Sequence, residues 1–224
     1  MGRNNIKAIW QLKKNGEIWN LFIIVLAIVI GITLQLIFKK VGIEDEASFG
    51  DILVAGIAYG YMIINLFIKV FVLADEVPRG LSFGMTRKVL FLYSRLADLA
   101  EILFIAVIAM LIPTSLTPNT ILKIAIAVYC LFNWIEATAG NGMLKFGKVV
   151  YWIYYILFLV IMIGGPRFIE SVSGVADGTA LIADMFINPF YNQLYVWLGI
   201  LAFSAAGLFV NWLTFRKIPV NFSL

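Results

Sequence analysis

The sequence predicts an all-α integral membrane protein with six membrane-spanning helices. The composition and the long apolar runs both indicate this class. Of the 224 residues, 62% are hydrophobic and only 13% are charged, and the mean hydropathy is +0.96. Soluble domains are roughly 45–50% apolar and about 25% charged. A chain of this size cannot hide so much apolar surface from water by folding alone. We therefore expect a bilayer around it, and one transmembrane domain over residues 1–224, because no polar stretch is long enough to fold separately.

The apolar runs set the number of predicted spans. A helix needs roughly 20 apolar residues to cross the hydrocarbon core of a bilayer. Six segments meet or approach this length, at about 20–38, 51–73, 96–114, 121–142, 149–165 and 191–214. They do not show the alternation of apolar and polar residues that β-barrel strands require. Helical spans are the remaining solution in lipid.

The distribution of basic residues predicts the orientation. Lys and Arg accumulate on the cytoplasmic side of membrane proteins. If the N-terminus is cytoplasmic, most of the 17 Lys and Arg residues lie inside, and only Lys39, Lys40, Lys123 and Arg167 lie outside. An even number of spans then places the C-terminus inside as well. We expect a multi-pass membrane protein with both termini cytoplasmic.

Residues 1–19 are predicted to form an amphipathic helix in the inner interface. Apolar side chains gather on one side of the helical wheel and polar ones on the other, with Lys13 interrupting the apolar face. Trp10 and Trp19 are suitable interfacial anchors. Two roles stay open for this segment: a plain lipid anchor, or a surface that contacts a cytoplasmic partner.

Residues 74–95 form the largest predicted cytoplasmic connection. Pro78 and Gly80 are expected to end the second span, and Thr86 is a suitable N-cap for the helix that follows. Between them lie apolar side chains (Phe83, Met85) and cations (Arg87, Lys88). Exposed apolar groups rimmed by charge are typical of a protein–protein contact. A basic loop that holds lipid head groups is the alternative.

The outer connections differ in length. Residues 113–120, with two prolines, predict a tight outer hairpin, and residues 143–148 a tight inner turn. Residues 166–190 form the longest outer segment and are only moderately polar. We expect this segment to lie on the outer interface or to dip into it.

Polar residues inside the predicted spans are the candidates for a substrate path, because such residues are costly in lipid and often functional. They are Gln35, Asn65, Asn133 and Glu136. Hydrogen bonds that fix helix packing are the alternative role. Gly56 and Gly60 form a GxxxG motif, which allows close helix approach within the chain or across a dimer.

The residue inventory argues against an enzyme. The chain has no histidine and one cysteine, Cys130, so we expect no metal site, no cofactor and no usual nucleophile–base pair. Residues 142–148 nearly match a P-loop, but Val149 occupies the place of the magnesium-binding hydroxyl. The net charge of +4 is explained by orientation and lipid contact, without nucleic acid.

The stretch from Ser82 to Lys88, SFGMTRK, is similar to a Phe-Gly-x-Ser/Thr-Arg-Lys pattern in the permease subunits of ABC type-2 exporters of the type V fold. Asn188-Pro189-Phe190 before the last span also resembles that family. The outline of the chain resembles the small six-span members from Gram-positive bacteria. This resemblance implies an interfacial N-terminal helix, a cytoplasmic coupling helix between spans two and three, and a partly re-entrant segment between spans five and six.

The resemblance also implies a function and partners. The chain would pair with a second permease, identical or related, and bind two copies of an ABC ATPase that holds ATP and Mg. It would export an amphipathic or hydrophobic compound, such as an antimicrobial peptide, a drug or a lipid-like molecule. The ATPase contact would comprise Ser82, Phe83, Gly84, Met85, Thr86, Arg87, Lys88 and Phe91. A substrate-capturing subunit of an importer and a non-transporting structural or immunity protein are the alternatives.

Overall fold

A computed structural model describes residues 2–41 and 49–218 as a bundle of helices. Within these ranges every regular element is helical. The elements are α1 (Gly2–Val41), α2 (Phe49–Ser82), α3 (Arg87–Leu111), α4 (Pro118–Ile135), the π-helix η1 (Glu136–Gly140), α5 (Asn141–Phe146), α6 (Lys148–Ser171), α7 (Ser173–Ile187) and α8 (Gln193–Phe215). The all-α fold predicted from the sequence is confirmed.

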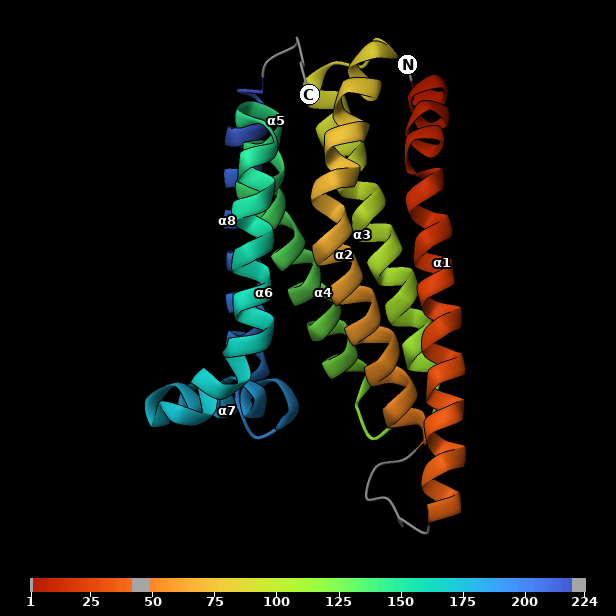
Figure 1. Ribbon diagram of the computed structural model, residues 1–224, viewed down its shortest axis with the longest axis vertical. Coiled ribbons are helices and arrows are strands. Elements are labelled where there is room, and N and C mark those ends of the chain that lie inside the picture. The colour runs from red at the N-terminus through yellow and green to blue at the C-terminus, as the bar shows by residue number, and fades with distance from the viewer. Residues whose placement is uncertain (1, 42–48, 219–224) are drawn as a thin grey trace.

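The long helices run side by side, and α7 lies transverse to α6 near one end, projecting away from the bundle (Figure 1). The start of α1, the α2–α3 turn, the α5–α6 turn and the end of α8 lie together at the other end. We call this the inner end, and the end with α7 and the α3–α4 hairpin the outer end. An even number of passes along the bundle therefore separates the two ends of the described chain.

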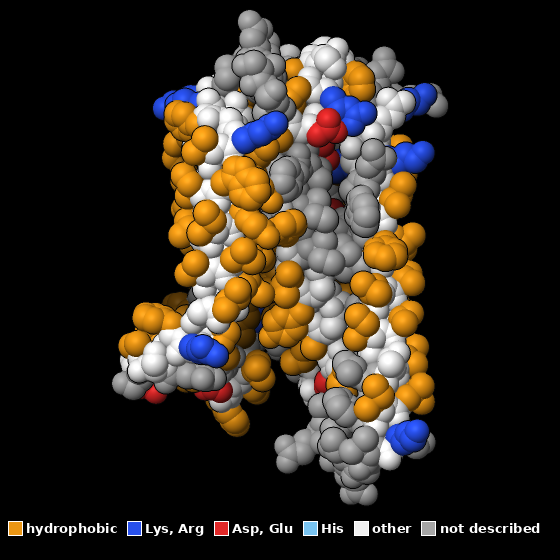
Figure 2. Space-filling view, in the orientation of Figure 1, with side chains coloured by type: hydrophobic (Ala, Val, Ile, Leu, Met, Phe, Trp, Pro, Cys, Tyr) orange, Lys and Arg blue, Asp and Glu red, His pale blue; other side chains and the backbone are white. Residues whose placement is uncertain are grey.

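Four of the described helical stretches are long and apolar enough to cross a membrane. They are Phe49–Phe67, Pro118–Phe146, Lys148–Ile169 and Gln193–Phe215. Four of the six predicted spans correspond to them. α1 contributes a shorter apolar stretch, Ile24–Thr33, and α3 falls short because its inner half carries Arg95, Asp98 and Glu101. Figure 2 shows hydrophobic side chains over the flanks of the bundle and most visible basic ones near the inner end.

The N-terminal segment corrects one prediction. Residues 2–19 do not form a separate helix in the interface, because α1 continues through them without a break for 40 residues, about 60 Å. Leu12 and Lys13 are buried against the bundle, which explains why the segment follows the axis of the first predicted span. Trp10 is 65% exposed, and the Trp19 side chain lies outside the described part of the chain.

The α2–α3 connection corrects a second prediction. Pro78 and Gly80 do not end α2, which continues to Ser82, so no separate coupling helix lies between α2 and α3. The connection is a short turn with Gly84 at a φ of 77°. The amide of Met85 donates to the carbonyl of Gly80 at 3.3 Å, and the amide of Gly84 to that of Leu81 at 3.0 Å. This pair of bonds is a Schellman motif, which ends a helix with glycine in the left-handed region.

The start of α3 confirms the predicted cap. The hydroxyl of Thr86 accepts a hydrogen bond from the amide of Val89 at 3.4 Å, so Thr86 is the N-cap. Both helix ends that flank the turn are thus satisfied by the turn's own groups. The turn is a short, defined tip on two long helices.

Two charged side chains, the half-buried Asp51 and the buried Lys123, connect the elements of the outer end through hydrogen bonds. The Asp51 carboxylate accepts from the Ser115 amide at 2.7 Å and from the Ser115 hydroxyl at 2.8 Å, which fixes the predicted hairpin. Lys123, counted above among the basic residues on the outer side, is 1% exposed and donates to the carbonyl of Phe186 and to Gln193 Oε1. These bonds join α7 to α4 and α8. The 166–190 segment therefore consists of the end of α6, with Pro166 inside it, and α7, which lies transverse to α6, and its expected position on or within the outer interface stays a prediction.

Candidate functional site

Six charged side chains meet inside the inner half of the bundle, and we call them the ion cluster. They are Lys13 of α1, Lys69 and Glu76 of α2, Arg95 and Asp98 of α3, and Glu136 of η1. Each is at most 9% exposed. Three cations face three anions, so the formal charge of the cluster is balanced. Charged residues buried within a membrane protein are by default a functional hypothesis.

Asp98 is the central anion of the cluster. Its Oδ1 accepts a hydrogen bond from the Lys13 ammonium and lies 3.0 Å from Lys69 Nζ. Its Oδ2 lies 3.1 Å from Nη2 of Arg95, one turn earlier in α3. One carboxylate therefore contacts cations from three helices, α1, α2 and α3.

Glu136 is the second node and extends the cluster to α8. Its Oε2 is paired with Arg95 Nη1, and its Oε1 lies 3.9 Å from Lys69 Nζ. Asn211 of α8 donates to Glu136 Oε2 at 3.2 Å. Glu136 begins the π-helix, and π-turns inside α-helices are frequent at functional sites.

Amide side chains continue the network between α4, α5 and α8. Asn211 Nδ2 lies 3.4 Å from Asn133 Oδ1, and Asn141 Nδ2 donates to Asn211 Oδ1 at 2.8 Å. Asn141 also donates to the hydroxyl of Thr214 at 2.8 Å. Because Gly207 lies against the Trp134 indole, where an added Cβ would be 2.9 Å from Nε1, α4 and α8 approach closely enough for these bonds.

Burial and neighbouring charges shift the pKa values of Lys13 and Glu76, which lie at the inner-end edge of the cluster. Burial disfavours the charged ammonium of Lys13, but the carboxylates of Asp98 and Glu76 outweigh it and raise the pKa of Lys13. Burial raises the pKa of Glu76, opposed by Lys13, whose Nζ is 3.7 Å from Glu76 Oε2. Removing one partner of such a buried set is costly, because it leaves an uncompensated charge.

Several atoms of the ion cluster have no hydrogen-bond partner among the described residues. They are Arg95 Nε, Asp98 Oδ2 and Glu136 Oε1. Asp98 Oδ2 and Glu136 Oε1 nevertheless lie within ion-pair distance of Arg95 Nη2 and Lys69 Nζ, so charge attraction rather than directed hydrogen bonds holds this part of the cluster.

The α2–α3 turn is mechanically connected to this cluster. Arg87 donates to the carbonyl of Arg216 at 2.9 Å, which ties the turn to the end of α8. Phe91 packs on Trp212 and Phe215, with ring centroids 5.2 and 5.5 Å apart. Arg95 follows one turn later, about 12 Å along α3 from the turn. A displacement of the turn therefore acts on α3, which supplies Arg95 and Asp98, and on α8, whose Asn211 is bonded to Glu136.

The predicted ATPase contact is only partly exposed. Ser82, Phe83, Gly84, Thr86 and Lys88 lie on the surface, with Phe83 51% exposed. Met85 is 6% exposed and belongs to the inner core, and Phe91 faces α8. Both were expected at the contact surface, and both instead hold the turn onto the bundle. Arg87 is half-buried because its guanidinium turns toward α8.

The residues predicted to line a substrate path do not all lie together in the structure. Asn133 and Glu136 join the network described above, whereas Asn65 donates to the carbonyl of Tyr61 in its own helix at 3.0 Å. The side chain of Gln35 lies outside the described part of the chain. Gly56 and Gly60 are half-buried on α2, and their role in packing stays a prediction.

Sequence reasoning missed most of the ion cluster because it assigned Lys13, Lys69 and Arg95 to the membrane surface. One signal was available: Lys13 interrupts an apolar helix face, and Asp98 sits among apolar residues at the start of a predicted span. A cation and an anion in such positions can pair across helices.

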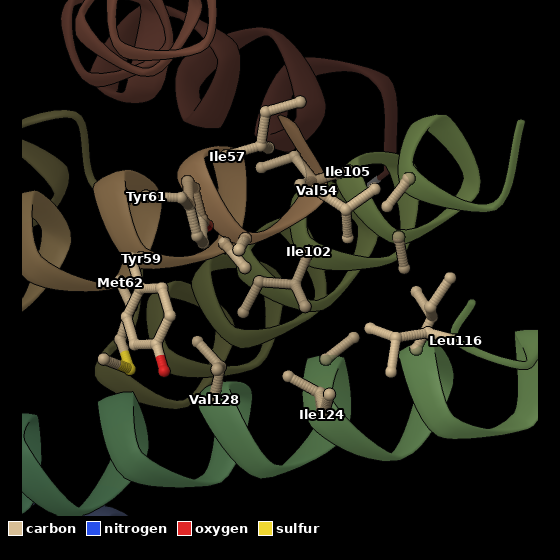
Figure 3. A pocket seen from close by; sticks show the side chains of 16 residues that line it. Val54, Ile57, Tyr59, Tyr61, Met62, Ile102, Ile105, Leu116, Ile124 and Val128 are labelled. Carbon is tan, nitrogen blue, oxygen red and sulfur yellow. The ribbon is translucent and has the colours of Figure 1, made fainter. Parts of the chain in front are cut away.

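An apolar cavity of about 480 Å³ lies toward the outer end of α2, α3 and α4 (Figure 3). The labelled side chains of Val54, Ile102 and Ile124 come from these three helices. Tyr61 lines the cavity and donates its hydroxyl to Glu101 Oε1 at 2.9 Å, on the side toward the ion cluster. The volume is within the range of small-molecule sites, roughly 300–1,000 Å³.

No protein-family model, no curated protein and no solved structure matches this chain.

Proposed function

We propose that the chain is the membrane-spanning permease subunit of an ABC type-2 exporter, driven by an ATPase in a separate chain. The observation that carries the proposal is the α2–α3 tip: an exposed, capped turn held by α3 and α8 above a buried ion cluster. A transporter of this kind needs a surface that takes up force from an ATPase and a core that can change its helix contacts.

The turn is suited to receive force because it is defined at both ends. The Schellman motif ends α2 and Thr86 caps α3, so the tip cannot move without its helices. Phe83 offers an apolar group for a cleft in the ATPase, and Lys88 offers a cation at the rim. Buried aromatic anchors with a polar rim are the usual energetic core of protein interfaces.

The ion cluster is suited to respond because its helices are joined by charges rather than by apolar packing alone. Lys13, Asp98 and Glu136 come from three different elements, and each can take another cluster partner if the helices shift. Two discrete arrangements of such contacts are what a conformational cycle requires.

In the proposed arrangement α1, α2, α3, the α4–α5 unit, α6 and α8 form six spans in the plasma membrane of a bacterium, with the inner end cytoplasmic. Two permeases, identical or related, bind two ATPase copies, which hold ATP and Mg. The substrate is an amphipathic or hydrophobic compound. The apolar cavity between α2, α3 and α4, with a polar group at its inner side, supports that substrate class.

Co-purification with the ABC ATPase encoded beside the chain tests the proposal. The test variant is Phe83→Asp with Lys88→Glu, both exposed on the turn. Arg87 is left unchanged because its bond to Arg216 is structural. The matched control is Phe146→Asp with Lys145→Glu, an exposed Phe–Lys pair on the α5–α6 turn at the same end of the bundle.

We expect the wild type and the control to retain the ATPase and the test variant to lose it. Loss in both variants would place the contact elsewhere on the inner end. If no ATPase binds the wild type, the exporter and importer functions both fail, and a non-transporting role takes their place. ATP-dependent uptake of the substrate into inside-out vesicles, whose cytoplasmic face points outward, corresponds to export and therefore distinguishes export from import.

A further inference from the structure

A second cavity opens at the inner end between α2 and α6, and we call it the inner groove. Its volume is about 620 Å³. It is lined by Phe67, Ala74, Asp75, Pro78 and Arg79 of α2, by Met143 of α5, and by Lys148, Tyr151, Trp152 and Tyr155 of α6. On α6 these residues recur at intervals of three and four, so they form one face of the helix.

Aromatic contacts form the wall of the inner groove. Tyr155 of α6 packs edge-on against Phe67 of α2, with ring centroids 5.3 Å apart. Tyr155 also stacks on Tyr151 at 6.0 Å, and Trp152 lies edge-on to it at 6.1 Å. Trp152 is 58% exposed. Exposed Trp and Tyr near the end of a membrane-spanning helix are typical of the level of lipid head groups.

Charged groups form the mouth of the inner groove. Arg79 pairs with Asp75 at 2.7 Å, and both side chains are largely exposed. Lys148 lines the same cavity and has no carboxylate within ion-pair distance among the described residues. The mouth therefore carries two cations against one anion.

The backbone of α2 adds a polar feature to the same wall. Pro78 has no N–H, so it cannot donate to the carbonyl of Ala74 one turn earlier. Both residues line the groove. Ala74 itself is buried in the inner core, so the exposed polar groups that a ligand can reach on this wall are the Asp75 carboxylate, an acceptor for hydroxyl groups, and the cations, which suit a phosphate.

We propose that the inner groove binds the head group and upper acyl chains of an anionic phospholipid from the surrounding leaflet. The charge of the mouth complements a phosphodiester, and arginine and lysine are the side chains that bind phosphate. The aromatic wall accommodates the acyl chains, and the exposed Trp152 lies beside the glycerol region. This site depends on membrane insertion of α2 and α6 and not on the exporter function.

Lipid fits the groove better than a partner helix does. A helix in the groove would bury Arg79, Lys148 and Asp75 with one charge left uncompensated, which is unfavourable in a low-dielectric environment. A phosphodiester supplies the missing negative charge at that position. Juxtamembrane basic residues attract anionic lipid by about 1 kcal/mol each.

Native mass spectrometry of the full chain tests the site. The purified protein is exchanged into detergent with equal amounts of phosphatidylglycerol and phosphatidylcholine of the same acyl chains, and bound lipid is counted. The test variant is Arg79→Gln with Lys148→Gln. The matched control is Lys145→Gln with Arg216→Gln, two exposed cations at the same end that do not line the groove.

We expect wild type and control to retain phosphatidylglycerol over phosphatidylcholine, and the test variant, which lacks two cations worth about 1 kcal/mol each, to lose that preference by roughly thirtyfold. Equal retention of the two lipids by the wild type would overturn the site. An equal loss in the control would also overturn it, because the basic inner end would then attract lipid without a specific groove. If Trp152→Ala keeps the preference for phosphatidylglycerol but retains less of both lipids, the result would support the aromatic residues as the wall that holds the acyl chains. Failure of ATPase co-purification leaves this result unaffected, so the two proposals are separable.

Discussion

Replacing Asp98 by asparagine removes the central charge of the ion cluster while keeping the size of the side chain. Asp98 is 1% exposed and contacts Lys13, Lys69 and Arg95. The change leaves three cations facing two anions in a buried site. Removing one partner of a buried ion pair typically costs about 3–5 kcal/mol, because the remaining charge is uncompensated. For a chain of this length we expect a fall in the unfolding temperature on the order of 10 °C.

The ion pair between Asp75 and Arg79, two residues one turn apart in α2, provides the control for Asp98→Asn. Its N–O distance is 2.7 Å, but its side chains are 50% and 66% exposed. Exposed ion pairs contribute about 0–1 kcal/mol, so Asp75→Asn is expected to change stability little. Thermal unfolding in detergent, followed by tryptophan fluorescence, measures both variants. An unfolding temperature for Asp98→Asn within the error of that for Asp75→Asn would refute the reasoning.

A double variant shows whether Asp98→Asn lowers stability by unbalancing the charge of the cluster or by changing the packing at Asp98. Lys13→Met removes one cation from the cluster, so Lys13→Met with Asp98→Asn restores formal neutrality. We expect the double variant to lose less stability than the sum of the two single variants, since residues in one ion-pair network are coupled. Strict additivity would mean that Lys13 and Asp98 do not interact.

Three glycine and cap substitutions test the turns. Gly50→Ala is expected to prevent folding, because the added Cβ would lie 1.5 Å from the Pro113 carbonyl oxygen. Gly174→Ala is the control, because its Cβ would meet nothing within 4 Å. The yield of monodisperse protein is measured for both variants and is expected to fall only for Gly50→Ala. Gly84→Ala should destabilise the chain by about 1–2 kcal/mol because φ is 77°, and Gly84→Asn by less, as measured by thermal unfolding. Thr86→Ala should cost about 1 kcal/mol in the same assay while Thr86→Ser stays near wild type, and equal losses would exclude a capping role.

The features that the sequence predicted well depend on local or averaged signals. The apolar runs at 51–73, 121–142, 149–165 and 191–214 each overlap most of a helical stretch suited to a span, because length and hydropathy are properties of the segment itself. The N-cap at Thr86 was predictable because capping uses a side chain and an amide three residues apart. The hairpin at 113–120 follows from its two prolines.

The features that the sequence did not predict depend on tertiary partners. Lys13, Lys69 and Arg95 look like topology signals along the chain, and only the approach of α1, α2, α3 and η1 shows that they neutralise Asp98 and Glu136. The same contacts explain why α1 continues inward instead of turning along the interface. The prediction that α2 ends at Pro78 was wrong because its neighbours Ala74 and Val77 are buried in the inner core. Their tertiary packing outweighs the one backbone hydrogen bond that the proline removes.

The native cysteine offers the most direct test of the claim that a separate ATPase rearranges the helices joined by the ion cluster. Cys130 is the sole cysteine of the sequence, is 1% exposed, and precedes Asn133 by one turn of α4. The measurement is its rate of alkylation by a small membrane-permeant maleimide in the permease–ATPase complex, with and without ATP. We predict that ATP changes this rate in the wild type and in the Phe146→Asp, Lys145→Glu control, and not in the Phe83→Asp, Lys88→Glu variant. An unchanged rate in a wild-type complex that hydrolyses ATP would contradict the account.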